Sequence, residues 1–144
     1  MDQLHTRCPH CHAVNRLPAD KFSDIANCGK CKEPLLSGKP IEGTAENFEA
    51  LIGSDQPVVI DFWAPWCSPC VGFAPVFEQS AQNRGEAVRF VKVNTEDEQS
   101  LAARFGIRSI PCIMVFKNGE AVDVINGALP QSHFEQWLDT ALAK

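Results

Sequence analysis

Two cysteines three residues apart, Cys67 and Cys70, stand where an apolar stretch gives way to a helical pattern. The apolar run 58–60 before them is typical of a buried strand, and the apolar residues after them recur at helical spacing. Cysteines three apart at the start of a helix share one face of its first turn, so a disulfide between them needs little backbone movement. The helix N-terminus also favours a thiolate on the first cysteine. The pattern predicts a two-thiol redox centre, and the alternative is a structural disulfide.

Four further cysteines form two pairs near the N-terminus. Cys8 and Cys11 make one C-x-x-C pair, Cys28 and Cys31 make another, and sixteen residues separate the pairs. This spacing is typical of zinc sites, and four thiolates complete a tetrahedral zinc shell. A segment this short cannot bury a core unaided, so the metal would have to hold it. The sequence therefore predicts one structural zinc ion and no organic cofactor, and the alternative is two local disulfides.

Two histidines beside these cysteines, His10 and His12, are alternative metal ligands. Because four thiolates already complete the ligand set, we expect both histidines to be exposed beside the metal. The stretch after the fourth cysteine contains Pro, Ser and Gly and has the composition of a linker. We expect a zinc-binding domain over residues 1–33, a linker over 34–39 and a second domain over 40–144.

Composition limits the functions that fit the chain. It has 144 residues, 44% of them hydrophobic, and a net charge of −5, which suits one packed domain plus something small. The negative charge does not favour non-specific binding to nucleic acid or to an anionic membrane, and no run is long enough to span a bilayer. Residues 1–8 contain no apolar signal region, and seven cysteines without an export signal indicate thiol or metal chemistry. We expect a cytoplasmic monomer without nucleic-acid or membrane partners.

Strand and helix signals alternate along the second domain. Thr44 is expected to cap a short helix, and Gly106 is expected to close a later one. Asn118-Gly119 is a hairpin signal that joins a strand over 107–116 to one over 121–125. Ser132 and Glu135 have the spacing of a capping box for the last helix. The order β-α-β-α-β-α-β-β-α predicts an α/β fold, with a mixed sheet covered by helices on both faces.

These residues resemble the thioredoxin family. The match includes Asp61, the run 62–64, Trp66 directly before Cys67, and Pro75 inside the helix. Ile110-Pro111 and Asn126-Gly127-Ala128 match further landmarks of the family. With the four N-terminal cysteines, the whole chain resembles the zinc-containing thioredoxin 2 type, which implies a thioredoxin fold preceded by a small zinc-ribbon-like domain. Ser68 departs from the glycine that most thioredoxins carry between the cysteines, and two-thiol chemistry remains possible with it.

The resemblance implies a role for each residue of the centre. Cys67 would be the nucleophile and Cys70 the resolving thiol, Asp61 would accept the proton of Cys70, and Lys92 would be the partner of Asp61. The apolar neighbours of Asp61 favour burial over exposure at a sheet edge, whereas Lys92 could equally be an ordinary exposed lysine. The residues implied to bind substrate are Trp66, Ile110, Pro111 with a cis peptide bond, and Gly127.

One cysteine departs from the family. Cys112 stands where threonine is common, next to Pro111. It could lie near the active pair, but the apolar alternation after it favours a buried strand residue that behaves as a small hydrophobe.

The activity implied by the resemblance is thiol–disulfide reduction in the cytoplasm, with recharging by thioredoxin reductase at the expense of NADPH. The implied clients are ribonucleotide reductase, sulfoxide and sulfate-assimilation reductases, and peroxidases. One rival is an oxidase or isomerase on the same fold. Another is a zinc-ribbon adaptor or redox sensor with little reductase activity, against which the intact Cys67/Cys70 pair argues.

Overall fold

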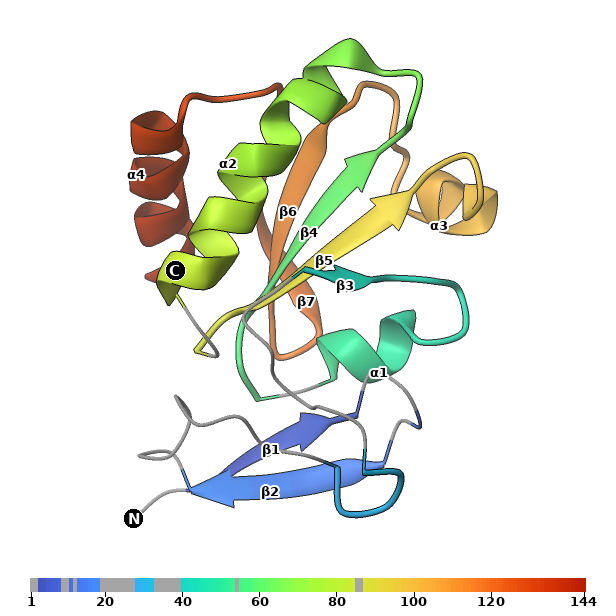
Figure 1. Cartoon of the computed structure of the whole chain (residues 1–144), viewed down its shortest axis with the longest axis vertical. Coiled ribbons are helices and arrows are strands. Elements are labelled where there is room, and N and C mark those ends of the chain that lie inside the picture. Colours follow the sequence, from blue (N-terminus) through green and yellow to red (C-terminus); the bar gives the residue numbers. More distant parts are fainter. Residues whose placement is uncertain are drawn as a thin grey trace.

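The structure is a computed structural model. The residues that it describes contain two separate β-sheets (Figure 1). The smaller is an antiparallel pair of β1 (Gln3–Arg7) and β2 (Val14–Pro18). With the four nearby cysteines these strands form a unit that we call the ribbon. The larger sheet and its helices form the larger domain. The described residues are 3–8, 11, 13–18, 28–32, 40–53, 55–84 and 87–144.

The larger sheet has five strands in the order β3-β5-β4-β6-β7. Strands β3 and β4 both run parallel to β5, β6 is antiparallel to β4, and β7 is antiparallel to β6. Four helices alternate with the strands, so the predicted element order and the mixed sheet are confirmed. In chain order the elements are β3 (Ile41–Glu42), α1 (Phe48–Ile52), β4 (Val58–Trp63), α2 (Ser68–Arg84), β5 (Arg89–Asn94), α3 (Gln99–Arg104), β6 (Cys112–Lys117), β7 (Glu120–Asn126) and α4 (Gln131–Leu142).

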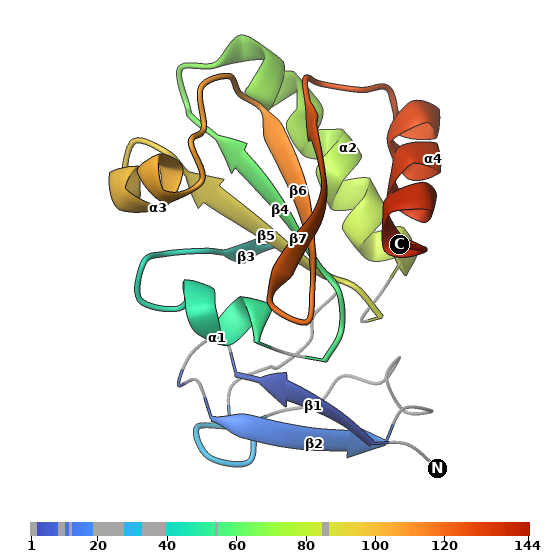
Figure 2. The same ribbon diagram turned by 180° about the vertical axis from the view of Figure 1, so that it is seen from behind.

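The helices cover both faces of this sheet (Figures 1 and 2). On one face, α1 and α3 pack through Phe48 and Leu101 against Ile60 and other strand side chains. On the other face, α2 and α4 pack through Phe73 and Phe134, whose rings meet edge to face at 5.0 Å. Because side chains alternate along a strand, β4 supplies both cores and is buried over 58–62. Packing on both faces therefore fixes β4, the strand that directly precedes the cysteine turn.

Two hairpin residues behave as predicted. Asn118 and Gly119 both have positive φ, 56° and 80°, as a two-residue turn between antiparallel strands requires. The strand before the turn is shorter than expected, because it begins at Cys112 instead of residue 107. Proline lacks the N–H that a sheet ladder needs, so the ladder with β4 starts just after Pro111.

Gly106 closes α3 as predicted: it follows the C-cap Phe105 and has φ of 62°. The two N-terminal caps predicted from sequence were wrong in detail. Asn47, not Thr44, is the residue at the start of α1; Thr44 instead exchanges hydrogen bonds with Asn47 one turn earlier, at 2.7 and 3.3 Å. Helix α4 begins after Pro130, which places Ser132 inside the helix. The Glu135 carboxylate does not cap α4, because it accepts hydrogen bonds from Ser80 and other residues.

The ribbon lies at one end of the larger domain, and the start of α2 lies at the opposite end (Figures 1 and 2). The His5 N–H donates to the Asp55 carboxylate at 2.7 Å, and the Asp55 N–H donates to the His5 carbonyl at 2.8 Å. These two bonds fix β1 beside the segment that leads into β4. The predicted linker over 34–39 lies outside the described residues.

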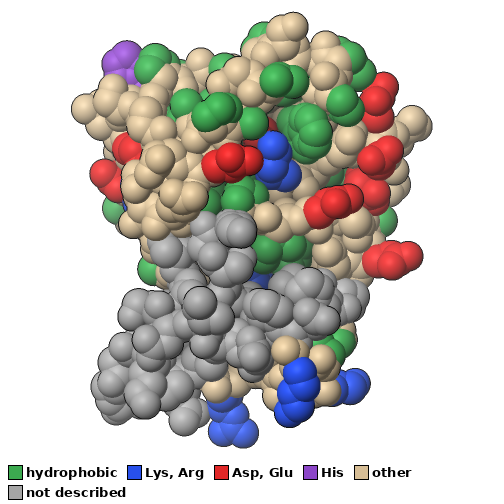
Figure 3. Space-filling view, viewed as in Figure 1, with side chains coloured by type: hydrophobic (Ala, Val, Ile, Leu, Met, Phe, Trp, Pro, Cys, Tyr) green, Lys and Arg blue, Asp and Glu red, His purple; other side chains and the backbone are tan. Residues whose placement is uncertain are grey.

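The exposed surface has two features that bear on partners. Acidic side chains gather along the right-hand edge of the larger domain in the view of Figure 3, in keeping with the net charge of −5. Within the described ranges, no helix is long and apolar enough to cross a membrane. Large apolar side chains are well exposed at a few described positions, and two of these, Trp66 and Val71, flank the cysteine pair.

Candidate functional site

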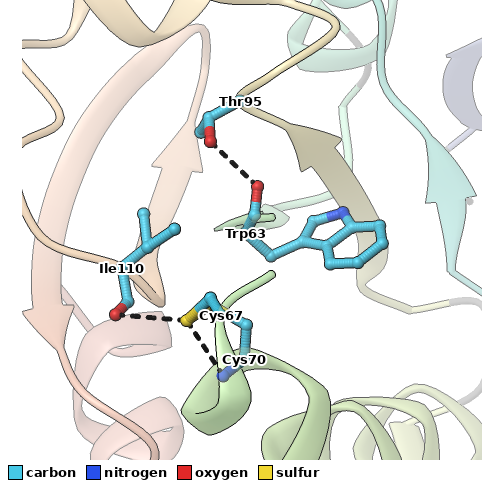
Figure 4. The surroundings of a disulfide bond; sticks show 5 residues. All are labelled: Trp63, Cys67, Cys70, Thr95 and Ile110. Atoms are coloured by element: carbon cyan, nitrogen blue, oxygen red, sulfur yellow. Dashed lines mark hydrogen bonds between the residues drawn. A yellow bond between two sulfur atoms is a disulfide. The ribbon is translucent and has the colours of Figure 1, made fainter. Parts of the chain in front are cut away.

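The cysteine pair lies at the junction of β4 and α2. Cys67 directly precedes α2, Cys70 lies in its first turn, and the two form a disulfide with Cα atoms 5.2 Å apart. The backbone N–H of Cys70 is 3.2 Å from the Cys67 sulfur (Figure 4). A backbone donor at a helix N-terminus stabilises negative charge on the sulfur it faces, so the reduced pair favours the thiolate at Cys67.

The two sulfurs differ in how they can be reached. In the disulfide form, Cys67 is 6% exposed to solvent, whereas Cys70 is 1% exposed and faces the interior. Trp66, beside Cys67, is 67% exposed, as the turn position predicted, whereas Trp63 is partly buried. An incoming disulfide therefore meets an apolar surface and the outer sulfur first.

The segment before β6 forms the opposite wall of the site. The Ile110–Pro111 peptide bond is cis, as the family resemblance implied, and the Ile110 carbonyl oxygen is 3.7 Å from the Cys67 sulfur (Figure 4). The Pro111 carbonyl accepts a hydrogen bond from Gly127 at 2.9 Å. Gly127 has φ of 111°, which side-chain-bearing residues rarely adopt. The structure thus brings Ile110, Pro111 and Gly127 together beside Cys67.

Asp61 is fully buried in the middle of β4. Its two carboxyl oxygens have no hydrogen-bond partner among the described residues. Burial raises the pKa of this carboxyl to about 7, and the charge of Lys92 opposes the rise. A carboxyl that titrates near neutrality can take up and release a proton under physiological conditions. The burial of Asp61 that its apolar neighbours predicted is confirmed.

Lys92 is the register partner of Asp61 on the adjacent parallel strand. Its ammonium lies 4.5 Å from the centroid of the Trp63 ring, in a cation–π arrangement. Both Lys92 and Trp63 line a cavity of about 360 Å³ at this end of the sheet. Lys92 is therefore close enough for its charge to lower the pKa of Asp61. Its ammonium group packs against the Trp63 ring, and the side chain lines the cavity.

Cys112 lies in the core instead of the site. It is 4% exposed and packs with the apolar side chains on the α1 and α3 face. Burial raises the pKa of its thiol, and the charge of Asp61 raises it further. A buried thiol that resists ionisation is a poor nucleophile, which agrees with its interpretation as a small hydrophobe.

Thr95 is a positioning residue that the sequence did not predict. The Thr95 hydroxyl donates to the Trp63 carbonyl at 3.0 Å, and its backbone N–H donates to the same oxygen at 2.8 Å (Figure 4). These bonds fix the last residue of β4, immediately before the cysteine turn. Thr95 is far from Trp63 in the chain, so no local pattern could have indicated the contact.

The four N-terminal cysteines converge on one point. Their sulfur atoms all lie within 4.8 Å of one another. Cys8 and Cys31 are 3.5 Å apart, and Cys11 and Cys28 are 3.6 Å apart. Zinc–thiolate bonds of about 2.3 Å in a tetrahedron would separate the sulfurs by about 3.8 Å. The cluster therefore has the donor set and the size of a metal site; His10 and His12 lie outside the described residues.

Donors around the Cys28 sulfur favour its ionised form. The N–H groups of Cys31 and Lys30 lie at 3.5 and 3.3 Å, and the Asn15 side-chain amide lies at 3.5 Å. The bond from Cys31 has the largest effect, and together these contacts lower the pKa of Cys28 to about 5 against the opposing effect of burial. A metal binds thiolates, so the local structure prepares this ligand for one.

Comparison with known proteins agrees with this geometry. A family model described as Thioredoxin matches residues 39–140, and one described as Thioredoxin 2, N-terminal matches residues 7–33. The chain is 43% identical over 136 residues to Thioredoxin C-3 of Corynebacterium nephridii, which covers 94% of this chain and 93% of that one. It is 46% identical over 91 residues to the thioredoxin of Porphyra purpurea, covering 63% of this chain and 85% of that one.

A solved structure is also similar. The thioredoxin Mala s 13 of Malassezia sympodialis superposes with a TM-score of 0.65 at 34% identity, covering 72% of this chain and 92% of that one. The similarity in structure and the similarity in sequence thus point to the same group of proteins.

Proposed function

Because the chain belongs to the thioredoxin family of protein disulfide oxidoreductases, we propose that its Cys67–Cys70 dithiol works in the reducing direction on client proteins. The observation that carries this proposal is the position of the Cys67 sulfur. It lies at the start of a helix, 3.2 Å from the N–H of Cys70 and beside the exposed Trp66. This arrangement favours a reactive thiolate at the place that a client can reach.

In the first step, the Cys67 thiolate attacks one sulfur of the client disulfide. The Cys67–client bond forms as the client disulfide breaks, and the departing client sulfur leaves as a thiolate that takes up a proton. The backbone of Ile110 and Gly127 would hold an extended client segment beside Cys67, as an added strand is held.

In the second step, Cys70 passes its proton to Asp61 and attacks the Cys67 sulfur. The Cys67–Cys70 disulfide forms, the mixed disulfide breaks, and the second client thiolate leaves and takes up a proton. Two electrons and two protons have then moved from the dithiol to the client. The step is intramolecular, because Cys70 lies one helical turn from Cys67.

The remaining partners follow from family membership. We propose that thioredoxin reductase regenerates the dithiol with electrons from NADPH. The proposed clients are ribonucleotide reductase, sulfoxide and sulfate-assimilation reductases, and peroxidases. A cytoplasmic location is supported by the four clustered cysteines of the ribbon, because thiolate metal ligands persist in a reducing compartment.

For the ribbon we propose one structural zinc ion held by Cys8, Cys11, Cys28 and Cys31. The support is the spacing of the four sulfurs and the match of residues 7–33 to the Thioredoxin 2 N-terminal model. Zinc bound to four thiolates is closed to substrate and supplies folding energy. Metal analysis of the reduced protein tests this, and a ratio well below one zinc per chain would refute it.

Trapping experiments test the redox roles. Cys70→Ser should accumulate a mixed disulfide at Cys67, because the resolving attack is lost, whereas Cys67→Ser should neither trap nor turn over. Cys112→Ser is the matched control and should reduce insulin at the wild-type rate, because Cys112 is buried in the core. Equal trapping by both active-site variants would erase the assigned order. Wild-type protein without insulin reduction would favour the adaptor or sensor.

A further inference from the structure

An arginine of the larger domain reaches the ribbon. Arg89 is the first residue of β5 and only 3% exposed, although it carries a full charge. Its Nη2 donates a hydrogen bond of 2.9 Å to the hydroxyl of Thr6, which is fully buried on β1. The backbone N–H of Arg89 donates to the Pro57 carbonyl at 2.9 Å, which fixes the base of the side chain next to β4. The guanidinium is therefore held between the larger sheet and the ribbon.

The metal cluster begins immediately beyond this contact. Thr6 is two residues before Cys8, and Cys8 has no exposed surface. Residues two apart along an extended chain share a face, and Cys8 directly follows β1. The hydrogen bond to Thr6 therefore holds the guanidinium of Arg89 on the buried face of the ribbon that also carries Cys8.

The charges of the two groups are complementary. A buried cation is costly unless a counter-charge lies near it. Four thiolates around one divalent ion carry a net charge of about −2, which is equally costly to bury alone. The backbone N–H groups of Cys11, Lys30 and Cys31 donate to the Cys8 and Cys28 sulfurs and supply partial positive charge, whereas Arg89 supplies a full positive charge.

We propose that Arg89 is a positioning residue of the metal site, and that its charge, supplied by the larger domain, links metal binding to docking of the ribbon. The inference rests on the proposed metal site but not on the proposed reductase activity. Arg89 is the first residue of β5, and β5 begins at the end of the sheet opposite the start of α2, where the redox cysteines lie (Figure 1).

The link must act in both directions. If Arg89 raises metal affinity by some factor, bound metal stabilises the docked position of Arg89 by the same factor. The pair of bonds between His5 and Asp55 holds β1 without involving the metal, so the ribbon need not leave the larger domain when metal is lost. Metal removal should instead loosen the start of β5.

Chelator competition on the reduced, full-length protein tests the first direction. Arg89→Gln retains a hydrogen-bond donor without the charge, and Arg89→Lys retains the charge. Changes just outside a metal's ligands typically lower affinity by 10–100-fold. We expect Arg89→Gln to weaken zinc binding by at least about tenfold, and Arg89→Lys to restore most of it. The thiolate absorption of the cobalt-loaded forms should show four sulfur ligands throughout.

The matched control is Arg84→Met, because the side-chain partners of Arg84, Glu135 and Asp139, both lie on α4. It should lower the stability of the larger domain and leave zinc affinity unchanged. Zinc affinity of Arg89→Gln within twofold of wild type would overturn the inference. Wild-type protein that binds no zinc would overturn the metal site and the inference together.

Amide hydrogen exchange of the unmutated protein tests the other direction, and it does not depend on any variant folding. Removing zinc should speed exchange at the first amides of β5, including Arg89, more than at the far end of the sheet near Thr95. Exchange at the start of β5 that is the same with and without zinc would overturn the link.

Discussion

Replacing Asp61 by asparagine should stabilise the protein at alkaline pH and leave its stability in acid nearly unchanged. Asp61 is fully buried, and burial raises the pKa of its carboxyl from 3.8 to about 7 against the opposing charge of Lys92. A folded-state pKa above the unfolded value means that ionisation opposes folding. The penalty is absent below the unfolded pKa of about 3.9, grows above it, and is complete above the folded pKa of about 7.

The expected effect is large relative to the stability of a domain. The rise from 3.8 to about 7 is roughly three units, and each unit corresponds to about 1.36 kcal/mol. The penalty at full ionisation is therefore about 4 kcal/mol, against a total stability of about 5–15 kcal/mol for a typical domain. Asparagine does not ionise and nearly matches aspartate in size, so it avoids both this penalty and the cavity that alanine would leave.

Urea denaturation of the oxidised proteins from about pH 4 to about pH 9 measures this difference. In the oxidised protein the disulfide removes Cys67 and Cys70 from the titration. The stability of Asp61→Asn relative to wild type should rise by about 4 kcal/mol across this range and level off above about pH 7. In the reduced protein, Cys70 must then lose its proton without a nearby base. Turnover should fall most near neutral pH and recover towards the thiol pKa of about 8.5.

An exposed aspartate provides the control. Asp97→Asn changes the same functional group on the surface and should leave the stability profile unaltered. Parallel stability curves for Asp61→Asn and wild type would show that Asp61 does not titrate near neutrality. Parallel rate profiles would remove it as the proton acceptor of Cys70.

Three further substitutions test neighbouring parts of the structure. Lys92→Met removes a charge that lowers the pKa of Asp61, so the midpoint of the stability profile should move to higher pH in the same urea titrations; an unmoved midpoint would separate the two residues. Trp66→Ala should raise KM for a protein disulfide much more than for a small aromatic disulfide, and equal effects in the two assays would argue against a docking role. Glu135→Gln deprives Arg84 of one of its two charged partners and should lower the free energy of unfolding by about 1–3 kcal/mol in urea denaturation, with no change in the Cys67–Cys70 potential.

Local sequence patterns were sufficient for the order of elements and for the redox centre. The apolar run before Cys67 and the helical spacing after Cys70 both depend on neighbours in the chain, so β4 and α2 could be recognised without a structure. The Asn118-Gly119 turn could be recognised for the same reason, because its positive φ angles restrict the residue types that fit. The burial of Asp61 followed from its apolar neighbours on both sides.

Contacts between distant segments were beyond such patterns. Glu135 has capping-box spacing with Ser132, but in the fold it faces Ser80 and Arg84 on α2, whose hydroxyl and guanidinium donate to its carboxylate. Its role was therefore decided by tertiary packing instead of by helix propensity. Thr95 likewise acquires its two bonds to the Trp63 carbonyl only when β5 pairs with β4.

Two buried charges on adjacent strands illustrate why burial leads to different functions. Asp61 on β4 can avoid its desolvation penalty by taking up a proton, so burial places its pKa near neutrality and suits it to proton transfer. Arg89 on β5 has no such option, because a guanidinium stays protonated at any physiological pH. It needs a counter-charge close by, and on the ribbon side the proposed metal cluster that begins at Cys8 would supply it. The same sheet can therefore hold a proton carrier in its middle and a permanent charge at its ribbon end, with burial as the common cause.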